Sequence, residues 1–462
     1  MLIRFQGDTP TVEGLERTYR KGFPWAMFIA LSLGMIVYGL AESYGPVSDA
    51  SNIVPSNYQW LGYSLPYIFG GVGAFLAGYL TDTFGRKRAF LAASGLTILG
   101  LLLYVPIYLG LAQTSSPLGL SLIVVSMALV GMAAIGLETP VLVAIAESAR
   151  PEHRSKLLVL APNFGNLGVA LAFIPLLLNA SGVQEETALL IMYVAIVAAL
   201  VVAWLKASES LPWIAVRKGA MSVDEAWRSI EGEQTKPVEP TAGIGARIAT
   251  LLALGISQDV AFVYITYGVT YSFFGGASLS GLPSTVVVPM VGGFVMTIIG
   301  VLAGLYLSGR IERRSFAVLS FSLQAVLWVL LAVFSYLSGF SLTTLVLALF
   351  ALNFVALELT WASRALLEPE LFPTNVRGLY VSIIRGTVWI VTGVITGLLS
   401  YMPALASSFL ASYVVMSAVA LVGAGAAAAW LLIGFETGGR SLVGLDLYHS
   451  GVPIRSARQK DS

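Results

Sequence analysis

Apolar runs of about twenty residues recur along this chain, and they constrain its fold more than any other feature. A helix needs about that length to cross a hydrocarbon layer ~30 Å thick. Hydrophobic residues make up 57% of the sequence and charged residues only 11%, whereas soluble domains carry about 25% charged residues. The sequence therefore predicts an all-α membrane protein. We expect twelve transmembrane helices, near residues 23–43, 59–80, 89–110, 118–146, 157–178, 187–206, 247–272, 285–308, 316–337, 341–367, 379–400 and 408–434.

The placement of lysine and arginine predicts the orientation of these helices. The 26 basic residues fall in the N-terminal arm, in every second loop, at or inside the tenth and eleventh spans, or in the tail. Basic residues bias loops toward the cytoplasm, so we expect both termini inside, in a multi-pass protein of the cytoplasmic (plasma) membrane. The expected outer loops carry no basic residue and lie near 44–58, 111–117, 179–186, 273–284, 338–340 and 401–407.

Three short segments occur twice at a nearly constant offset, which indicates an internal duplication of a six-helix unit. The pairs are Gly78–Arg88 with Gly304–Arg314, Glu147–Arg154 with Glu370–Arg377, and Glu209–Trp213 with Glu436–Arg440. Between the two units, Met221 to Ile230 places apolar residues at helical spacing, as in an amphipathic interfacial helix. The predicted parts are a six-helix bundle over 1–206, a cytoplasmic linker with that helix over 207–246, a second six-helix bundle over 247–436, and a cytoplasmic tail over 437–462.

Two of these segments carry a recognisable motif. Gly78–Arg88 fits the pattern G-x-x-x-D-x-x-G-R-[RK], and Glu370–Arg377 fits E-x-x-P-x-x-x-R. With these motifs the sequence resembles the major facilitator superfamily, and within it the sugar porter family and its organic-ion and phosphate relatives. The resemblance implies two pseudo-symmetric six-helix bundles in a rocker-switch transporter, with a cavity lined by spans 1, 4, 7 and 10.

The resemblance also implies that charges of the inner loops form a latch between the two halves. Carboxylates and arginines there can pair across a cytoplasmic seam in one state and separate in another, giving a bistable element of a few kcal/mol. Alternatively, these charges only anchor helix ends at the membrane interface. The expected latch residues are Asp82, Arg86, Glu147, Arg154, Glu209, Arg310, Arg313, Glu370, Arg377 and Glu436.

Four carboxylates lie inside predicted spans, one each on spans 1, 4, 7 and 10: Glu42, Glu138, Asp259 and Glu358. Hydrocarbon penalises an ionised side chain by at least ~2.5–3.5 kcal/mol, so each is a candidate functional residue. Neither histidine lies in a span, and proton coupling would therefore use carboxylates. We expect Glu42 or Asp259 to carry the proton and the other two acids to bind substrate or act as counter-ions. The alternative for each is a helix-end carboxylate that reaches water.

Amide and aromatic side chains accompany these acids in the spans. Amides make paired hydrogen bonds and rings stack on apolar faces, which suits a hydroxylated ring such as a sugar. The excess of acids equally suits a cationic solute, and tyrosine and tryptophan also serve in ordinary packing and at membrane interfaces. The expected substrate-binding residues are Glu138, Asn163, Asn166, Gln258, Tyr264, Tyr267, Asn353, Glu358, Trp361, Arg385 and Trp389.

The sequence contains no catalytic grouping. It lacks G-x-S-x-G, the phosphate-binding G-x-x-x-x-G-K, and any histidine or cysteine cluster for a metal, so we expect neither an enzyme nor a cofactor. The predicted function is secondary active transport: proton-coupled symport of a sugar or similar small polar organic solute, by a monomer in the lipid bilayer, with no nucleic-acid partner. An organic-cation carrier or exporter and a transport-inactive nutrient sensor are the alternatives.

Overall fold

The structure is a computed structural model. It describes residues 25–51, 53–58, 60–178, 185–207, 209–218, 223–231, 236–269, 278–279, 282–341, 343–401 and 409–449. Within these ranges, twelve helices are long and apolar enough to cross a membrane. The predicted number of spans and the all-α class are therefore confirmed. The prediction that both termini lie inside concerns the N-terminal arm and the end of the tail. Both of these segments lie outside the described residues.

The first half of the chain forms six spanning segments, three of which are broken into a long and a short helix. Its elements are α2 (Trp25–Glu42), α3 (Tyr44–Ala50), the 3-10 turn η1 (Ser56–Tyr58), α4 (Trp60–Phe84), α5 (Arg86–Leu102), α6 (Val105–Tyr108), α7 (Pro117–Ser148), α8 (Pro151–Ala172), α9 (Ile174–Leu178) and α10 (Glu185–Lys206).

The second half repeats this plan, and two of its helices continue into a π-helical turn. Its elements are α13 (Ile244–Val263) with η3 (Tyr264–Gly268), α15 (Ser284–Leu302) with η4 (Ala303–Leu307), α16 (Arg313–Leu337), α17 (Thr344–Glu370), α18 (Arg377–Tyr401) and α20 (Phe409–Ile433). The smaller elements are α11 (Leu211–Lys218), α12 (Val223–Glu231), α21 (Val443–His449) and an antiparallel pair of two-residue strands, β1 (Ser278–Leu279) and β2 (Leu282–Pro283).

Several helices extend into charged residues beyond the predicted apolar windows. α8 begins at Pro151 rather than near residue 157, and α5 begins at Arg86 rather than near residue 89. A hydropathy window stops where charges begin, whereas the helical backbone continues wherever those charges find partners in the protein. Local signals set other starts. Ser116, for example, accepts a hydrogen bond of 3.1 Å from the first turn of α7, and so acts as its N-cap.

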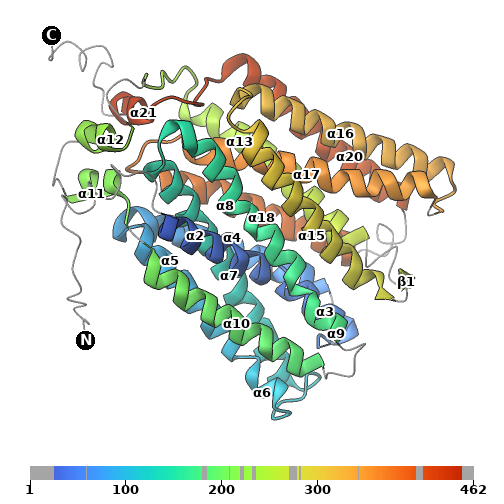
Figure 1. Ribbon diagram of the computed structural model, residues 1–462. Helices are drawn as coiled ribbons and strands as arrows, with labels where there is room; N and C mark the ends of the chain where they lie inside the picture. The colour runs from blue at the N-terminus through green and yellow to red at the C-terminus, as the bar shows by residue number, and fades with distance from the viewer. Residues whose placement is uncertain are drawn as a thin grey trace, which may run out of the picture.

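Two helix pairs make most of the contact between the halves: α4 with α18, and α8 with α15 (Figure 1). A Cβ atom on Gly71 would lie 2.4 Å from the carbonyl oxygen of Gly386. Ser64 donates a hydrogen bond of 3.0 Å to the carbonyl of Gly393. The missing side chains therefore let the backbones of α4 and α18 approach closely.

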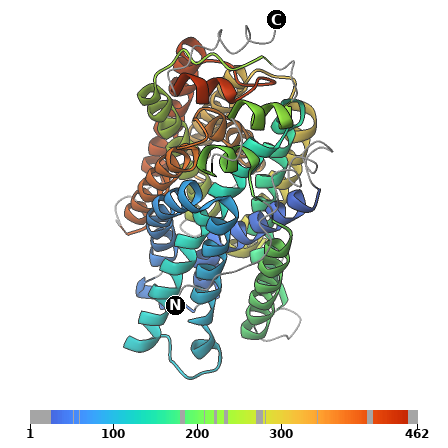
Figure 2. The same ribbon diagram turned by 90° about the vertical axis from the view of Figure 1, so that its left-hand side faces the viewer.

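The short helices α11, α12 and α21 lie together at one end of the bundle (Figures 1 and 2). We call it the basic end, because Arg86, Arg154, Arg313 and Arg377 lie there. The predicted amphipathic helix is present as α12, but three of its apolar residues are covered by protein. Ala226, Trp227 and Ile230 are buried.

Gly71→Ala should lower the melting temperature, because the added methyl group would collide with the backbone of α18. Overpacking of this kind costs about 1–3 kcal/mol. Gly95→Ala is the matched control, since the position of its Cβ atom on α5 faces open space and alanine favours a helix over glycine. Thermal unfolding of the detergent-solubilised protein compares the two. An unchanged melting temperature for Gly71→Ala would contradict the close α4–α18 contact.

Candidate functional site

A small cavity lies between the two halves. α2 and α8 contribute to its wall from the first half, and α13, α15, α17 and α18 from the second. Spans 1, 7 and 10 thus supply lining residues, as the resemblance implies, together with spans 5, 8 and 11. The lining residues are Tyr38, Glu42, Asn166, Gln258, Asp259, Phe262, Met296, Leu357, Trp361, Arg364, Arg385 and Trp389.

Aromatic rings form one wall of this cavity. The ring of Tyr38 lies 6.4 Å from that of Trp361 and 6.1 Å from that of Trp389, measured between centroids. Tyr67 supports Trp389 from behind, with centroids 4.8 Å apart. Tyr38 was missed by sequence reasoning. The available signal was its spacing, one helical turn before Glu42, which places both side chains on one face of α2.

Two carboxylates line the cavity without an ion-pair partner among the described residues. Glu42 is 4% exposed and accepts a long hydrogen bond of 3.5 Å from the hydroxyl of Tyr67. Asp259 is 5% exposed, and its Oδ2 atom has no hydrogen-bond partner in the described part of the chain. These are the two residues that we expect to carry the proton.

The arginines of the cavity are already neutralised by two other acids. Arg385 forms an ion pair with Glu138 of α7 and a second one, of 2.5 Å, with Glu368. Glu368 also pairs with Arg364 at 2.8 Å, and Arg364 donates a hydrogen bond to Gln258. Glu138 therefore lies behind Arg385 as a counter-ion. Glu368 was not among the predicted residues, although its spacing of four from Arg364 is typical of a helical ion pair.

The predicted amide ligands bind one another and a fourth acid. Asn166 donates hydrogen bonds to Glu358, at 2.5 Å, and to Oδ1 of Asn163, at 3.1 Å. Asn163 in turn donates to the carbonyl of Thr297, at 2.8 Å. Gly300 leaves room for this cluster, since a Cβ atom there would lie 2.3 Å from Glu358. The cluster joins α8 of the first half to α15 and α17 of the second.

Three further predicted ligands lie away from the cavity lining. Tyr264 faces Trp328 within the second half, with ring centroids 6.5 Å apart. Tyr267 forms a hydrogen bond of 3.1 Å with Ser43, which connects the two halves. Asn353 donates to a carbonyl of its own helix, α17. Polar residues on a helix that is buried on most sides serve packing as readily as binding, and the sequence does not distinguish the two uses.

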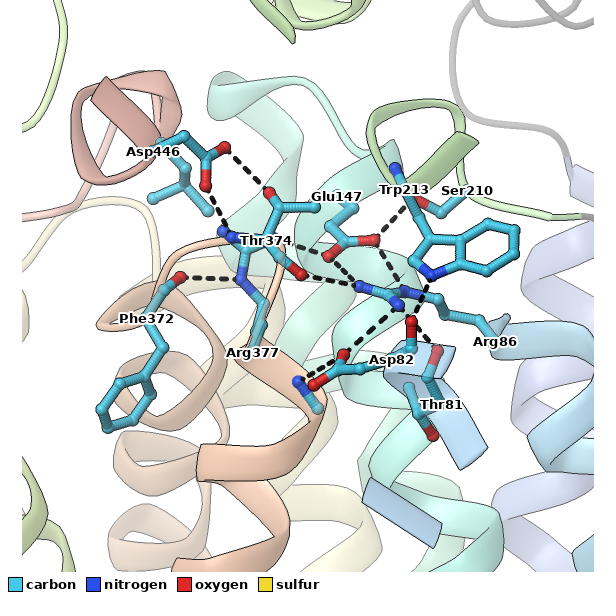
Figure 3. Close-up of polar contacts among 12 residues, drawn as sticks. Thr81, Asp82, Arg86, Glu147, Ser210, Trp213, Phe372, Thr374, Arg377 and Asp446 are labelled. Carbon is cyan, nitrogen blue, oxygen red and sulfur yellow. Dashed lines mark hydrogen bonds and ion pairs between the residues drawn. The ribbon is translucent and has the colours of Figure 1, made fainter. Parts of the chain in front are cut away.

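At the basic end, Glu147 of α7 binds side chains from both halves (Figure 3). It accepts hydrogen bonds from Arg86 of α5, at 2.6 and 2.9 Å, and from Arg377 of α18, at 2.9 Å. Ser210 adds a hydroxyl at 2.5 Å. All of these side chains are buried. We call this group the Glu147 cluster.

A second cluster repeats this arrangement with the halves exchanged. Glu370 of α17 accepts hydrogen bonds from Arg313 of its own half and Arg154 of the other half, both at 3.0 Å. Thr437 adds a hydroxyl at 2.5 Å. Glu147 and Glu370 occupy corresponding places in the duplicated unit. Each acid is therefore shared by one arginine from each half.

Asp82 makes a third connection between the halves. Its carboxylate accepts the backbone N–H groups of Gly378, at 3.0 Å, and Leu379, at 2.8 Å, at the start of α18 (Figure 3). A helix N-terminus is a natural anion site. Arg86 lies 3.4 Å from the same carboxylate. Glu209 accepts the backbone N–H of Arg86 at 2.9 Å, and burial raises the pKa of Glu209.

The linker and the tail cover both clusters. Glu231 of α12 forms an ion pair of 3.1 Å with Arg154. Asp446 of α21 accepts hydrogen bonds from the backbone N–H of Thr374, at 2.6 Å, and from the indole of Trp227, at 2.8 Å. Burial raises the pKa of Glu231 to about 7, against the lowering effect of Arg154, and burial also raises the pKa of Asp446.

Two other predicted latch residues, Arg310 and Glu436, take no part in the contacts described above. Arg310 is exposed. Glu436 accepts a hydrogen bond of 2.7 Å from the backbone N–H of Gly438. Repetition of a motif predicted the residue types of both clusters, but it did not reveal which copies of a motif retain the contact.

Comparison with known proteins agrees with this geometry. The family model described as "Major Facilitator Superfamily" matches residues 22–396. The chain belongs to this superfamily. The arabinose-proton symporter of Bacillus subtilis (strain 168) is 25% identical over 415 residues, which are 81% of this chain and 85% of that protein. The facilitated trehalose transporter Tret1 of Aedes aegypti is 26% identical over 181 residues, 36% of this chain and 21% of Tret1.

Solved structures of the superfamily share the fold. The proton:xylose symporter XylE bound to 6-bromo-6-deoxy-D-glucose superposes with a TM-score of 0.73 at 17% identity, covering 94% of this chain and 99% of that one. The human organic anion transporter MFSD10 superposes with a TM-score of 0.60 at 14% identity, covering 89% and 99%. As a superfamily member, the chain is a multi-pass membrane transporter and not an enzyme.

Removal of the shared acid in Glu147→Gln should open the basic end of this superfamily member. It leaves Arg86 and Arg377 buried without their counter-ion, and breaking a buried pair in this way costs ~3–5 kcal/mol. A cysteine at Ser382 would report the opening, because Ser382 is buried 3.3 Å from Thr139 of the other half. The sequence has no cysteine of its own. Labelling by a water-soluble maleimide should be at least about tenfold faster in Glu147→Gln/Ser382→Cys than in Ser382→Cys alone.

The matched control for this measurement is Glu312→Gln, which removes an exposed carboxylate at the same end of the bundle. Its labelling rate should equal that of Ser382→Cys alone, because exposed ion pairs contribute little. Equal rates for the Glu147 and Glu312 variants would contradict the closure of the basic end by the Glu147 cluster.

The raised pKa of Glu231 predicts a pH-dependent stability. Because this pKa rises from 4.5 to about 7 on folding, the folded state binds the proton more tightly than the unfolded chain. The resulting stabilisation is complete below about pH 4.5 and is lost as the pH rises through about 7. Between pH 6 and 8, the melting temperature of the native protein should therefore fall relative to that of Glu231→Gln. Glu239→Gln, an exposed linker acid, should follow the native protein at both pH values; parallel curves for all three would contradict the prediction.

Proposed function

We propose that the chain is a proton-coupled secondary transporter that moves a small polar organic solute, of the class that includes sugars, by alternating access. The observation that carries this proposal is the cavity between the halves, where Glu42 and Asp259 lack an ion-pair partner among the described residues. The names of the relatives support it: an arabinose-proton symporter matches most of the chain, and a proton:xylose symporter shares the fold.

We assign the proton-coupling step to Glu42 and Asp259. Arg364 and Arg385 are each held by Glu368, and Arg385 also by Glu138, so among the described residues neither arginine forms an ion pair with the two cavity acids. A proton on either acid reduces the charge that must stay in a closed cavity, and a move of the helices that admits water allows its release. Loading and release of protons thus become linked to the conformation.

We assign the gate to the two clusters at the basic end. Glu147 and Glu370 each hold an arginine from both halves, so the basic end opens only when both clusters separate. Basic residues face the cytoplasm, and we therefore assign this end to the cytoplasmic side of the plasma membrane, with both termini there. One chain provides the whole cavity, so the proposed unit of transport is a monomer. The division at residues 206, 246 and 436 stays a prediction.

Proteoliposomes with an imposed pH gradient test the coupling. Purified protein is reconstituted and exposed to labelled sugars, amines and carboxylates. Uptake of at least one solute should respond to the gradient, and Glu42→Gln and Asp259→Asn should abolish that response, because neither variant can exchange a proton at its site. Glu152→Gln, an exposed acid of α8, should behave like the native protein. If uptake of every solute ignores the gradient, proton coupling is wrong.

A further inference from the structure

Most of the amide groups that the sequence offers for a sugar already bind other groups of the protein. Both donors of Asn166 point at Glu358 and Asn163, and Asn163 donates to the carbonyl of Thr297. The amide oxygen of Gln258 accepts from Arg364. Free amides can bind a hydroxylated ring with paired donors and acceptors. Asn166 and the amide oxygen of Gln258 are therefore engaged within the protein in this conformation.

When the ion pairs beside the cavity are set aside, the charged groups left in its lining are both negative. Arg364 and Arg385 are balanced by Glu138 and Glu368, two cations against two anions. What is left in the lining is Glu42 and Asp259. Neither has an ion-pair partner among the described residues, and Oδ2 of Asp259 has no hydrogen-bond partner there although it is buried. Asp259 thus keeps a buried carboxylate oxygen without a partner among the described residues, and a positive charge between it and Glu42 would be stabilised.

The aromatic wall suits the same charge. Three aromatic rings line the cavity: Tyr38, Trp361 and Trp389. The ring centroid of Tyr38 lies 6.4 Å from that of Trp361 and 6.1 Å from that of Trp389. Aromatic faces attract ammonium groups within about 6 Å, tryptophan most strongly. The apolar side chains of Phe262, Met296 and Leu357 also line the cavity and offer contact to a hydrocarbon body.

We infer that the transported solute is an organic ammonium ion, whose charged nitrogen lies between the carboxylates of Glu42 and Asp259 and the rings of Tyr38, Trp361 and Trp389. This inference rests on the proposed transport function and narrows its substrate class. The carboxylates supply the charge, and the rings supply cation–π contact.

The inference links the solute to the proton. An ammonium group and a proton neutralise the same two carboxylates, so each displaces the other, and the affinity for the ammonium ion rises with pH. The titratable groups that face the acid pair are Tyr38 of α2, Tyr67 of α4, Glu138 of α7, Tyr267 of η3, Arg364 of α17 and Arg385 of α18. The two arginines are ion-paired with Glu138 and Glu368.

Calorimetric titration of the purified full-length protein tests this inference. The probes are tetraethylammonium, 2-phenylethylamine and 1,4-diaminobutane, with arabinose and xylose as neutral comparisons, at pH 6 and pH 8. At least one ammonium probe should bind, at least threefold more tightly at pH 8. Asp259→Asn, Glu42→Gln and Trp361→Leu should each weaken that binding tenfold or more. Glu152→Gln should leave it unchanged, and melting temperatures identify any variant that fails to fold.

Two outcomes would overturn the inference. One is binding of arabinose or xylose, with the same affinity at both pH values, and none of the ammonium probes. The other is ammonium binding that Asp259→Asn and Glu42→Gln leave intact in folded protein. Either result still permits gradient-driven uptake of a neutral solute in proteoliposomes, so the substrate class can fail while the transporter function stands. Uptake that ignores the gradient for every solute defeats the proposed function instead.

Discussion

The structure depends on buried carboxylates that are shared between arginines of both halves. Glu147 and Glu370 are fully buried, and each holds one arginine of its own half and one of the other. Such a charge is tolerated only with its partners, because desolvation costs several kcal/mol per ion. Since the six-helix unit is duplicated, the same solution occurs twice. The seam at the basic end is therefore held at two related points, and separation at either one takes an arginine of the opposite half away from its shared carboxylate.

The helices could be predicted from the sequence because hydrocarbon imposes a length on every span. The contacts at their ends could not. The repeated motifs supply a glutamate and an arginine in each copy, but Arg310 is exposed whereas Arg313, three residues later, binds Glu370. Glu231 gave no signal at all, since its partner Arg154 is 77 residues away in the chain. Which carboxylate pairs with which arginine depends on how the two halves pack together, and that packing brings together residues far apart in the sequence.

In the candidate site, too, some features could be predicted from the sequence and others could not. The cost of charge in hydrocarbon singles out Glu42 and Asp259, and both line the cavity. The role of an amide does not follow from such a cost, because an amide is satisfied equally by a solute or by a neighbouring helix. Asn166 and Glu358 meet across 192 residues, and that contact removes the amide from the set available to a solute. Sequence reasoning therefore finds the charged positions of a transport site more readily than its neutral ones.

Cavity and gate are connected by two continuous helices. α17 carries Glu358, Arg364 and Glu368 beside the cavity and ends at Glu370 in the gate. α18 begins at Arg377 in the gate and reaches Arg385 at the cavity after about two turns, or ~12 Å. A change in the charge that Arg385 faces thus acts on a helix whose first residue is bound by Glu147. Because Arg385 is tied through Glu368 to α17 as well, the two helices cannot respond independently, and occupancy of the cavity bears on both clusters at once.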